Sequence, residues 1–238
     1  MSLKPKFIST LAHDLKNSVG NSMMYSELLS MELQDLAEAN PQVGAEIEPL
    51  VQMSENIRLS NSKLINQINS WVYTHHFLNG IFEKEVSAIN MASFSDAIIE
   101  TNQYYLTKKG IKLEKDWESD ISLTTDKDIL RLILDNLFTQ IIIFSDNRNL
   151  IRFTLSQTPD TVTISIGDQH DSDRREVIER FLDEAGEITG DEIPEEGILK
   201  ATGYGMIFCG QAIKILDGQA SVEPNDLGGL TFSMQFKK

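Results

Sequence analysis

Three residues that could take part in a chemical reaction lie on one stripe of the helix predicted for residues 7–29. His13, Asn17 and Gly20 recur at about 3.6 residues per turn, and Asp14 directly follows the histidine. A neutral imidazole is a nucleophile, an adjacent carboxylate can fix its tautomer, and an amide can hold an oxyanion or a water molecule. Glycine inside a helix costs about 1 kcal/mol relative to alanine, which indicates that something comes close to the helix at Gly20.

The same stripe has a second interpretation that needs no chemistry. A single histidine on a polar helix face is commonly just solvated, and a glycine in mid-helix often marks a close crossing of two helices. The rest of the chain favours the chemical interpretation.

The His13 helix is the first of two long helices that we expect to form a hairpin. Its apolar residues Phe7, Leu11 and Leu15 recur every fourth position, and the pattern extends over residues 6–37. The turn residues of AEANPQVG, residues 37–44, then end it. A second helix begins near Pro49, a residue suited to a first helical turn.

The second helix has an apolar seam with a spacing close to that of a coiled coil. The seam consists of Leu50, Ile57, Leu64, Ile68 and Trp71. Nothing within an antiparallel hairpin is large enough to cover such a seam. We therefore expect a homodimer in which two hairpins form a four-helix bundle.

The periodicity changes near residue 80, which divides the chain into predicted domains of residues 1–80 and 81–238. Helical patterns cover residues 93–109, 126–144, 173–185 and 204–216, with Ser93 as the N-cap of the first and Gly110 as its stop. Strand patterns cover residues 111–117, 151–157, 162–168 and 230–236. This order predicts a two-layer α/β sandwich, in which helices cover one face of a mixed sheet.

The composition excludes several classes of function. The 238 residues carry a net charge of −15, which argues against a nucleic-acid-binding surface and against contact with a membrane surface. No apolar run approaches the roughly 18–20 residues of a membrane span, and we see no signal peptide. The single cysteine, Cys209, excludes an internal disulfide and fits a cytoplasmic location, and we expect it to be a small buried apolar residue.

Five stretches resemble, in order, the core of a bacterial sensor histidine kinase, and they span essentially the whole chain. The stretch that resembles the histidine box is FISTLAHDLKNSVGNSMMYSELL, and the one that resembles the family segment E-K-G-I-x-L-x is KKGIKLEKDW. The asparagine box is matched by DKDILRLILDNLFTQIIIFS, and the strand ending in the aspartate of the first glycine box by VTISIGD. The second glycine box is matched by GYGMIFCGQAIKILDGQ.

The resemblance implies a role for each residue of the opening stripe. His13 would be the phosphoacceptor, Asp14 would orient the imidazole and accept its proton, and Asn17 would contact the phosphoryl group or an attacking water molecule. The phosphoryl group would pass to an aspartate of a response-regulator receiver domain. Ser18 stands where the family usually has a proline, so we expect a straighter helix.

The resemblance also implies a site for ATP and Mg²⁺ in the second domain. Asn136 and Gln140 would supply two amides one turn apart, with Gln140 on the metal. Asp168 would recognise the adenine amino group. Gly203 and Gly205 would lead into a helix N-terminus suited to phosphate.

The nucleotide motifs depart from the family at several places. Ile143 replaces a basic residue, and His170 and Ser172 replace glycines that let the backbone approach a nucleotide. The segment 183–196 holds seven acidic residues and no Lys or Arg, which opposes triphosphate binding unless it is a solvated loop facing away. Leu216, Asp217 and Gly218 replace the usual H-G-G.

These departures leave three functions open. The chain could be an active histidine kinase core, or a histidine phosphotransfer protein whose second domain no longer binds ATP. It could also be a non-catalytic dimeric scaffold in which His13 is vestigial.

Overall fold

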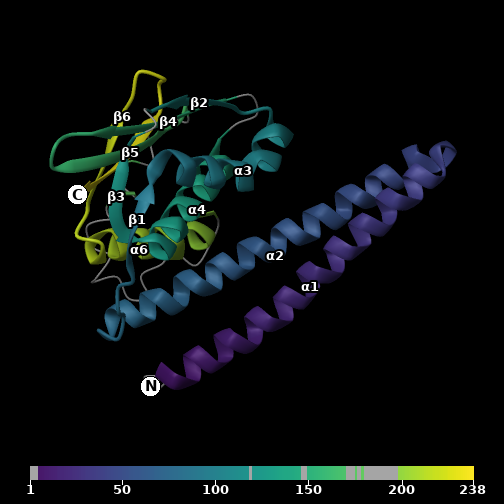
Figure 1. Ribbon diagram of the computed structural model, residues 1–238, viewed down its shortest axis with the longest axis horizontal. Helices are drawn as coiled ribbons and strands as arrows, with labels where there is room; N and C mark the ends of the chain where they lie inside the picture. The colour runs from purple at the N-terminus through teal and green to yellow at the C-terminus, as the bar shows by residue number, and fades with distance from the viewer. Residues whose placement is uncertain (1–4, 118–119, 146–148, 170–174, 176–177, 180–197) are drawn as a thin grey trace. The chain divides into compact units, whose positions relative to one another are not determined.

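The computed structural model describes residues 5–117, 120–145, 149–169, 175, 178–179 and 198–238 (Figure 1). The chain divides into two compact units, Met1–His75 and His76–Lys238. Nearly all of the first unit is helical, and the second contains a sheet with helices.

Two 35-residue helices, α1 (Pro5–Ala39) and α2 (Gly44–Leu78), form the hairpin predicted from the sequence. The connection contains a short 3-10 helix, η1 (Pro41–Val43), and Asn40 N donates to Leu36 O at 3.0 Å where α1 ends. The prediction that α2 begins near Pro49 was wrong. The helix starts at Gly44, because η1 leads directly into it, and Pro49 lies inside the helix.

Several hydrogen bonds join α1 and α2. Asn61 Nδ2 donates to Ser22 Oγ at 2.8 Å, Ser54 Oγ donates to the carbonyl oxygen of Ser26, and Lys16 Nζ donates to Asn69 Oδ1 at 3.3 Å. Many large apolar side chains of the hairpin are instead exposed on its outer faces. The hairpin alone therefore leaves much of its apolar surface in water.

The second unit contains a five-stranded mixed sheet in the order β2-β4-β5-β7-β6. Its strands are β2 (Lys112–Asp116), β4 (Leu150–Gln157), β5 (Thr161–Gly167), β6 (Gln219–Pro224) and β7 (Leu230–Lys237). Strand β2 runs parallel to β4, whereas the other neighbours are antiparallel. Alternate residues of β4, β5 and β7 are buried, so one face of the sheet packs on the core.

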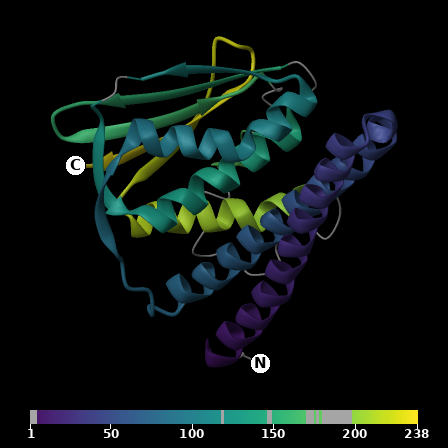
Figure 2. The same ribbon diagram turned by 45° about the vertical axis from the view of Figure 1, so that its right-hand side comes forward.

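Three helices cover that buried face, as Figures 1 and 2 show: α3 (Met91–Lys109), α4 (Lys127–Phe144) and α6 (Ile198–Ile215). The two-layer α/β fold predicted from the sequence is therefore confirmed. The sequence did not reveal the additional two-stranded sheet of β1 (Val86–Asn90) and β3 (Ser122–Asp126).

The caps of α3 and α4 show how local sequence sets the helix ends. Asn90, not the predicted Ser93, is the N-cap of α3, because its side chain accepts from Ser93 N at 2.9 Å. Gly110 ends α3 in the left-handed conformation, as predicted, with φ of 64°. Asp126 caps α4 by accepting from Asp128 N and Ile129 N.

Two sequence predictions fall largely outside the described residues. Of the predicted helix 173–185, only Arg175, Ile178 and Glu179 are described, all three are helical, and Arg175 Nε donates to Glu179 Oε1 at 2.7 Å. The acidic segment 183–196, and His170 and Ser172 before it, lie outside the described residues.

Candidate functional site

The candidate phosphoacceptor group lies on a continuous stretch of α1. His13 Nδ1 is 3.3 Å from Asp14 Oδ1, and Asn17 Nδ2 is 3.3 Å from the same nitrogen and 3.5 Å from His13 Nε2. The helix brings His13 and Asn17 together because residues four apart lie one turn above each other. The structure thus groups the three residues that the sequence singled out.

The His13 group is open to solvent. The side chains of His13 and Asp14 are 70% and 71% exposed, so a contact of this kind contributes little to stability. The same exposure makes the imidazole accessible to other molecules, as both interpretations of the sequence require.

The contacts of the described chain do not explain why residue 20 is a glycine. A Cβ atom built on Gly20 would meet nothing within 4 Å, so no neighbouring element of the described chain requires a glycine there. The close approach expected from the sequence must come from another molecule, or the glycine is tolerated. Helix α1 continues through Ser18 without interruption.

Two amides of the candidate nucleotide site lie one turn apart on α4. Asn136 is buried, and its Nδ2 donates to Leu132 O at 2.7 Å. Gln140 Oε1 is buried and has no hydrogen-bond partner among the residues that the structure describes. A buried amide oxygen without a partner is costly, which makes Gln140 a candidate ligand.

The two glycines of the second glycine box are not at a helix N-terminus. Helix α6 begins at Ile198, so Gly203 and Gly205 lie inside it, and the predicted start at Tyr204 was wrong. Ile198–Thr202 contains good helix formers that extend the helix backwards. Close packing explains the glycine at 205, because a Cβ there would lie 2.7 Å from Asn136 Oδ1 and 3.7 Å from Gln140 Nε2.

Asp168, the candidate adenine-recognition residue, directly follows β5 and is buried. Its main-chain N–H donates to Leu230 O at 3.0 Å, and Leu230 N is 3.4 Å from Asp168 Oδ1. Asn225 Nδ2 donates to Asp168 O at 2.9 Å. The β6–β7 turn therefore holds the end of β5.

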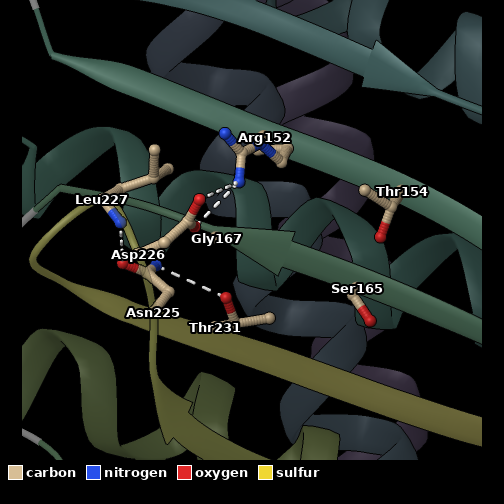
Figure 3. Close-up of a pocket in the computed structure, with 8 residues that line it drawn as sticks. All are labelled: Arg152, Thr154, Ser165, Gly167, Asn225, Asp226, Leu227 and Thr231. Carbon is tan, nitrogen blue, oxygen red and sulfur yellow. Dashed lines mark hydrogen bonds and ion pairs between the residues drawn. The ribbon is translucent and has the colours of Figure 1, made fainter.

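Figure 3 shows a second contact between the β6–β7 turn and the sheet. Arg152 NH1 donates to Asp226 Oδ1 at 2.8 Å and to Oδ2 at 3.2 Å. The sequence interpretation did not single out Arg152 or Asn225. The available signal was the turn sequence Asn-Asp-Leu-Gly-Gly between two strand patterns, which predicts a turn and says nothing about Asp168.

The donors at α4 fit the chemistry of Mg²⁺, which prefers oxygen ligands. Asn136 and Gln140 both carry amide oxygens, and the Gln140 oxygen is buried without a partner in the described part of the chain. Gly205 of α6 packs directly on Asn136. These two amides are thus candidate ligands, and Gly205 of α6 packs on one of them.

Two further groups near these elements have altered acidity. Burial raises the pKa of Asp135 to about 6, although Arg131 opposes the shift, and Asp135 Oδ1 has no hydrogen-bond partner among the described residues. Burial also raises the pKa of the Cys209 thiol. Cys209 is fully buried, which confirms the predicted apolar role and makes it unreactive.

The described helices include none that is long and apolar enough to cross a membrane. No family model matches the chain. A curated relative is the heme sensor protein HssS of Staphylococcus saprophyticus, which is 22% identical over 237 residues. The match covers 99% of this chain and 47% of HssS, so the chain spans about half the length of this relative.

Solved histidine kinase structures share the fold. The catalytic domain of histidine kinase ThkA matches with a TM-score of 0.54 and 17% identity, covering 65% of this chain and 97% of ThkA. Acinetobacter baumannii histidine kinase AdeS matches with a TM-score of 0.56 and 13% identity, covering 86% of this chain and 94% of AdeS. Full-length ShkA in complex with AMPPNP matches with a TM-score of 0.61 and 17% identity, covering 98% of this chain and 46% of ShkA.

Proposed function

We propose that this chain, which has the fold of a sensor histidine kinase core, transfers phosphoryl groups in two-component signalling. His13 receives a phosphoryl group from ATP and passes it to an aspartate of a response-regulator receiver domain. The observation that carries the proposal is the exposed cluster of His13, Asp14 and Asn17 on α1.

In this proposal, each residue of the cluster has a role. Asp14 Oδ1 accepts the proton on His13 Nδ1, which leaves the lone pair of Nε2 for attack on the γ-phosphorus. A nitrogen–phosphorus bond forms, the bond from the phosphorus to the bridging oxygen breaks, and ADP leaves. The Nδ1 proton passes to Asp14. Asn17 Nδ2, at 3.5 Å from Nε2, can donate to a phosphoryl oxygen.

The second unit would hold the nucleotide. The oxygens of Asn136 and Gln140 would bind Mg²⁺, and Asp168 would accept the adenine amino group. When bound, the metal supplies positive charge against the phosphates. Orienting the triphosphate is the task of the chain's own residues on α4 and at the end of β5.

The exposed apolar stripes of the hairpin support a homodimer. On α1, residues with alternating spacings of three and four include Leu11, Leu15, Tyr25, Leu29 and Leu36, which are 40–66% exposed. On α2, Leu50, Met53, Ile57 and Leu64 repeat at the same spacing and are 43–60% exposed. Such stripes are typical of helices that pack in a bundle, and a twofold dimer would cover both.

A second stripe of α1 supports docking of a protein partner beside His13. Met24 and Met31 continue the spacing of His13, Asn17 and Gly20, and they are 48% and 57% exposed. Methionine side chains adapt to varied surfaces. A receiver domain seated here would bring its aspartate to His13.

A phosphotransfer protein without kinase activity is the second candidate. The packing of Gly205 on Asn136, together with the bond from Asn136 to Leu132, favours it, because ATP would have to compete with these contacts. In that case His13 exchanges phosphoryl groups with receiver domains only.

One pair of labelling experiments tests both candidates. The chain is incubated with radiolabelled Mg-ATP, and separately with receiver domains phosphorylated by radiolabelled acetyl phosphate. Labelling in both experiments supports the kinase, and labelling only by the receivers supports the phosphotransfer protein. His13→Gln abolishes the label in either case, and equal labelling of this variant would overturn the proposal.

A further inference from the structure

The side chain of Asn225 joins two parts of the second unit. Its Nδ2 donates to Asp168 O at 2.9 Å, and its Oδ1 accepts from Leu227 N at 3.0 Å and from Gly229 N at 2.9 Å. One amide thus shapes the β6–β7 turn with its oxygen and holds the main chain of Asp168 with its nitrogen. The two functions can be separated by substitution.

Gly167 creates the space in which Asn225 lies. A Cβ atom on Gly167 would be 3.2 Å from Asn225 Nδ2 and 2.9 Å from Thr231 Oγ1, which is closer than side chains normally pack. Figure 3 shows Asn225, Gly167 and Thr231 grouped beside the β6–β7 turn, at the end of β5. The glycine immediately before Asp168 therefore leaves room for both Asn225 and Thr231.

Asp168 depends on this region for its position. Its N–H donates to Leu230 O, and Leu230 N is 3.4 Å from Asp168 Oδ1. Leu230 directly follows the turn that Asn225 shapes. Asn225 Oδ1 accepts from the N–H of Gly229, the residue before Leu230. A shift of Asn225 would therefore move the carbonyl of Asp168 directly and its carboxylate through Leu230.

We propose that Asn225 is a positioning residue for Asp168 and thereby sets the purine preference of the nucleotide site. The inference rests on the proposed function, in which the Asp168 carboxylate accepts from the adenine amino group. Guanine presents a carbonyl oxygen at the corresponding place, and a fixed carboxylate rejects it. A carboxylate that is free to turn away loses this discrimination.

The test uses Asn225→Asp in the full chain. Aspartate keeps an oxygen for Leu227 N and Gly229 N, so the turn is retained, but it has no N–H for Asp168 O. Titration calorimetry with Mg-ATP and with Mg-GTP gives the ratio of affinities, in which any general effect of the added charge on a triphosphate cancels. We expect the ATP preference to fall about tenfold, the equivalent of about 1.4 kcal/mol. A merely structural role would leave this ratio unchanged.

Two further variants make the result unambiguous. Gly167→Ala pushes on Thr231 Oγ1 and on Asn225 Nδ2 from β5, and it should lower the ATP preference in the same direction. Arg152→Leu removes the contact with Asp226, the other attachment of the turn, and should leave the preference unchanged. A wild-type preference kept by Asn225→Asp, or lost equally in Arg152→Leu, overturns the inference while the proposed function stands.

Hydrogen exchange of the Asp168 and Leu230 amides separates this inference from the proposed function. If the wild type binds neither nucleotide at millimolar concentration, the kinase form of the proposal fails. In that case the hydrogen exchange of these two amides still tests whether Asn225 positions Asp168. Exchange at least tenfold faster in Asn225→Asp than in Arg152→Leu supports it, and equal exchange in the two variants overturns it.

Discussion

Gly205 of α6 lies against Asn136 of α4 so closely that a Cβ on the glycine would be 2.7 Å from Asn136 Oδ1. The three nearest atoms of other elements belong to the side chains of Asn136 and Gln140, the two candidate ligands. Any change at Gly205 therefore acts first on the proposed metal site rather than on the backbone.

Gly205→Ala should consequently weaken nucleotide binding with little effect on folding. The added methyl group displaces the side-chain amide of Asn136, and the gain in helix propensity of about 1 kcal/mol offsets part of the cost. We expect the affinity for Mg-ATP to fall about tenfold and the free energy of unfolding to change by less than about 1 kcal/mol. Calorimetry and urea denaturation measure the two quantities. Unchanged affinity would show that Asn136 is not used.

Gly20→Ala is the matched substitution on α1, where a Cβ meets nothing within 4 Å. It should raise the free energy of unfolding by about 0.5–1 kcal/mol and leave nucleotide affinity unchanged. Transfer from a phosphorylated receiver domain is measured on the same sample. Slower transfer would identify a receiver as the molecule that approaches Gly20, and destabilisation would identify the second hairpin.

Substitutions of Met24 and Leu29 test the two apolar stripes of α1 independently. The two side chains are 48% and 50% exposed and lie on different faces of the helix. Leu29→Glu places a charge in the proposed dimer interface and should give a monomer in light scattering. Met24→Glu should remain a dimer, but it should accept phosphoryl groups from a receiver about tenfold more slowly. The opposite pattern, or the same result for both variants, would contradict the assignment of the stripes.

Asp14→Asn tests the proton acceptor beside His13. Asparagine can still accept a hydrogen bond from Nδ1, but it cannot take the proton, so the initial rate of His13 labelling should fall by about 10²-fold. Asp35→Asn, an exposed change of the same kind on α1, is the control and should label normally. A fall of equal size in both variants would show a general effect of charge on the hairpin.

The sequence predicts what depends on short-range pattern. The hairpin, the end of α3 at Gly110 and the strand alternation of β4, β5 and β7 all follow from spacing within one element. The grouping of His13, Asp14 and Asn17 could also be predicted, because a single helix fixes their distances.

Long-range contacts account for what could not be predicted. The packing of Gly205 inside α6 on Asn136 of α4 is a contact between two helices, which the spacing within one element does not reveal. Strands β1 and β3 have five residues each and pair only with one another, so neither shows a distinct pattern alone. Asn225 acquires its role only when the β6–β7 turn meets Asp168, 57 residues away in sequence.

Asp135 should make the second unit less stable as the pH rises. Its pKa is about 6 in the folded state because of burial, against an ordinary value of 3.8, so the folded state binds the proton more tightly. The stabilisation is complete below pH 4 and is lost as the pH passes through 6, and it amounts to at most about 3 kcal/mol.

Asp135→Asn removes this titration while it preserves the shape of the side chain. Relative to the variant, the wild type should lose unfolding free energy between about pH 4 and pH 6, and the shifts of other carboxylates cancel in the difference. Urea denaturation is followed by the fluorescence of Trp117, which packs on Phe153 at 5.3 Å between ring centroids, in a Trp71→Phe background. A difference that stays constant over this pH range would show that Asp135 is solvated in the folded protein.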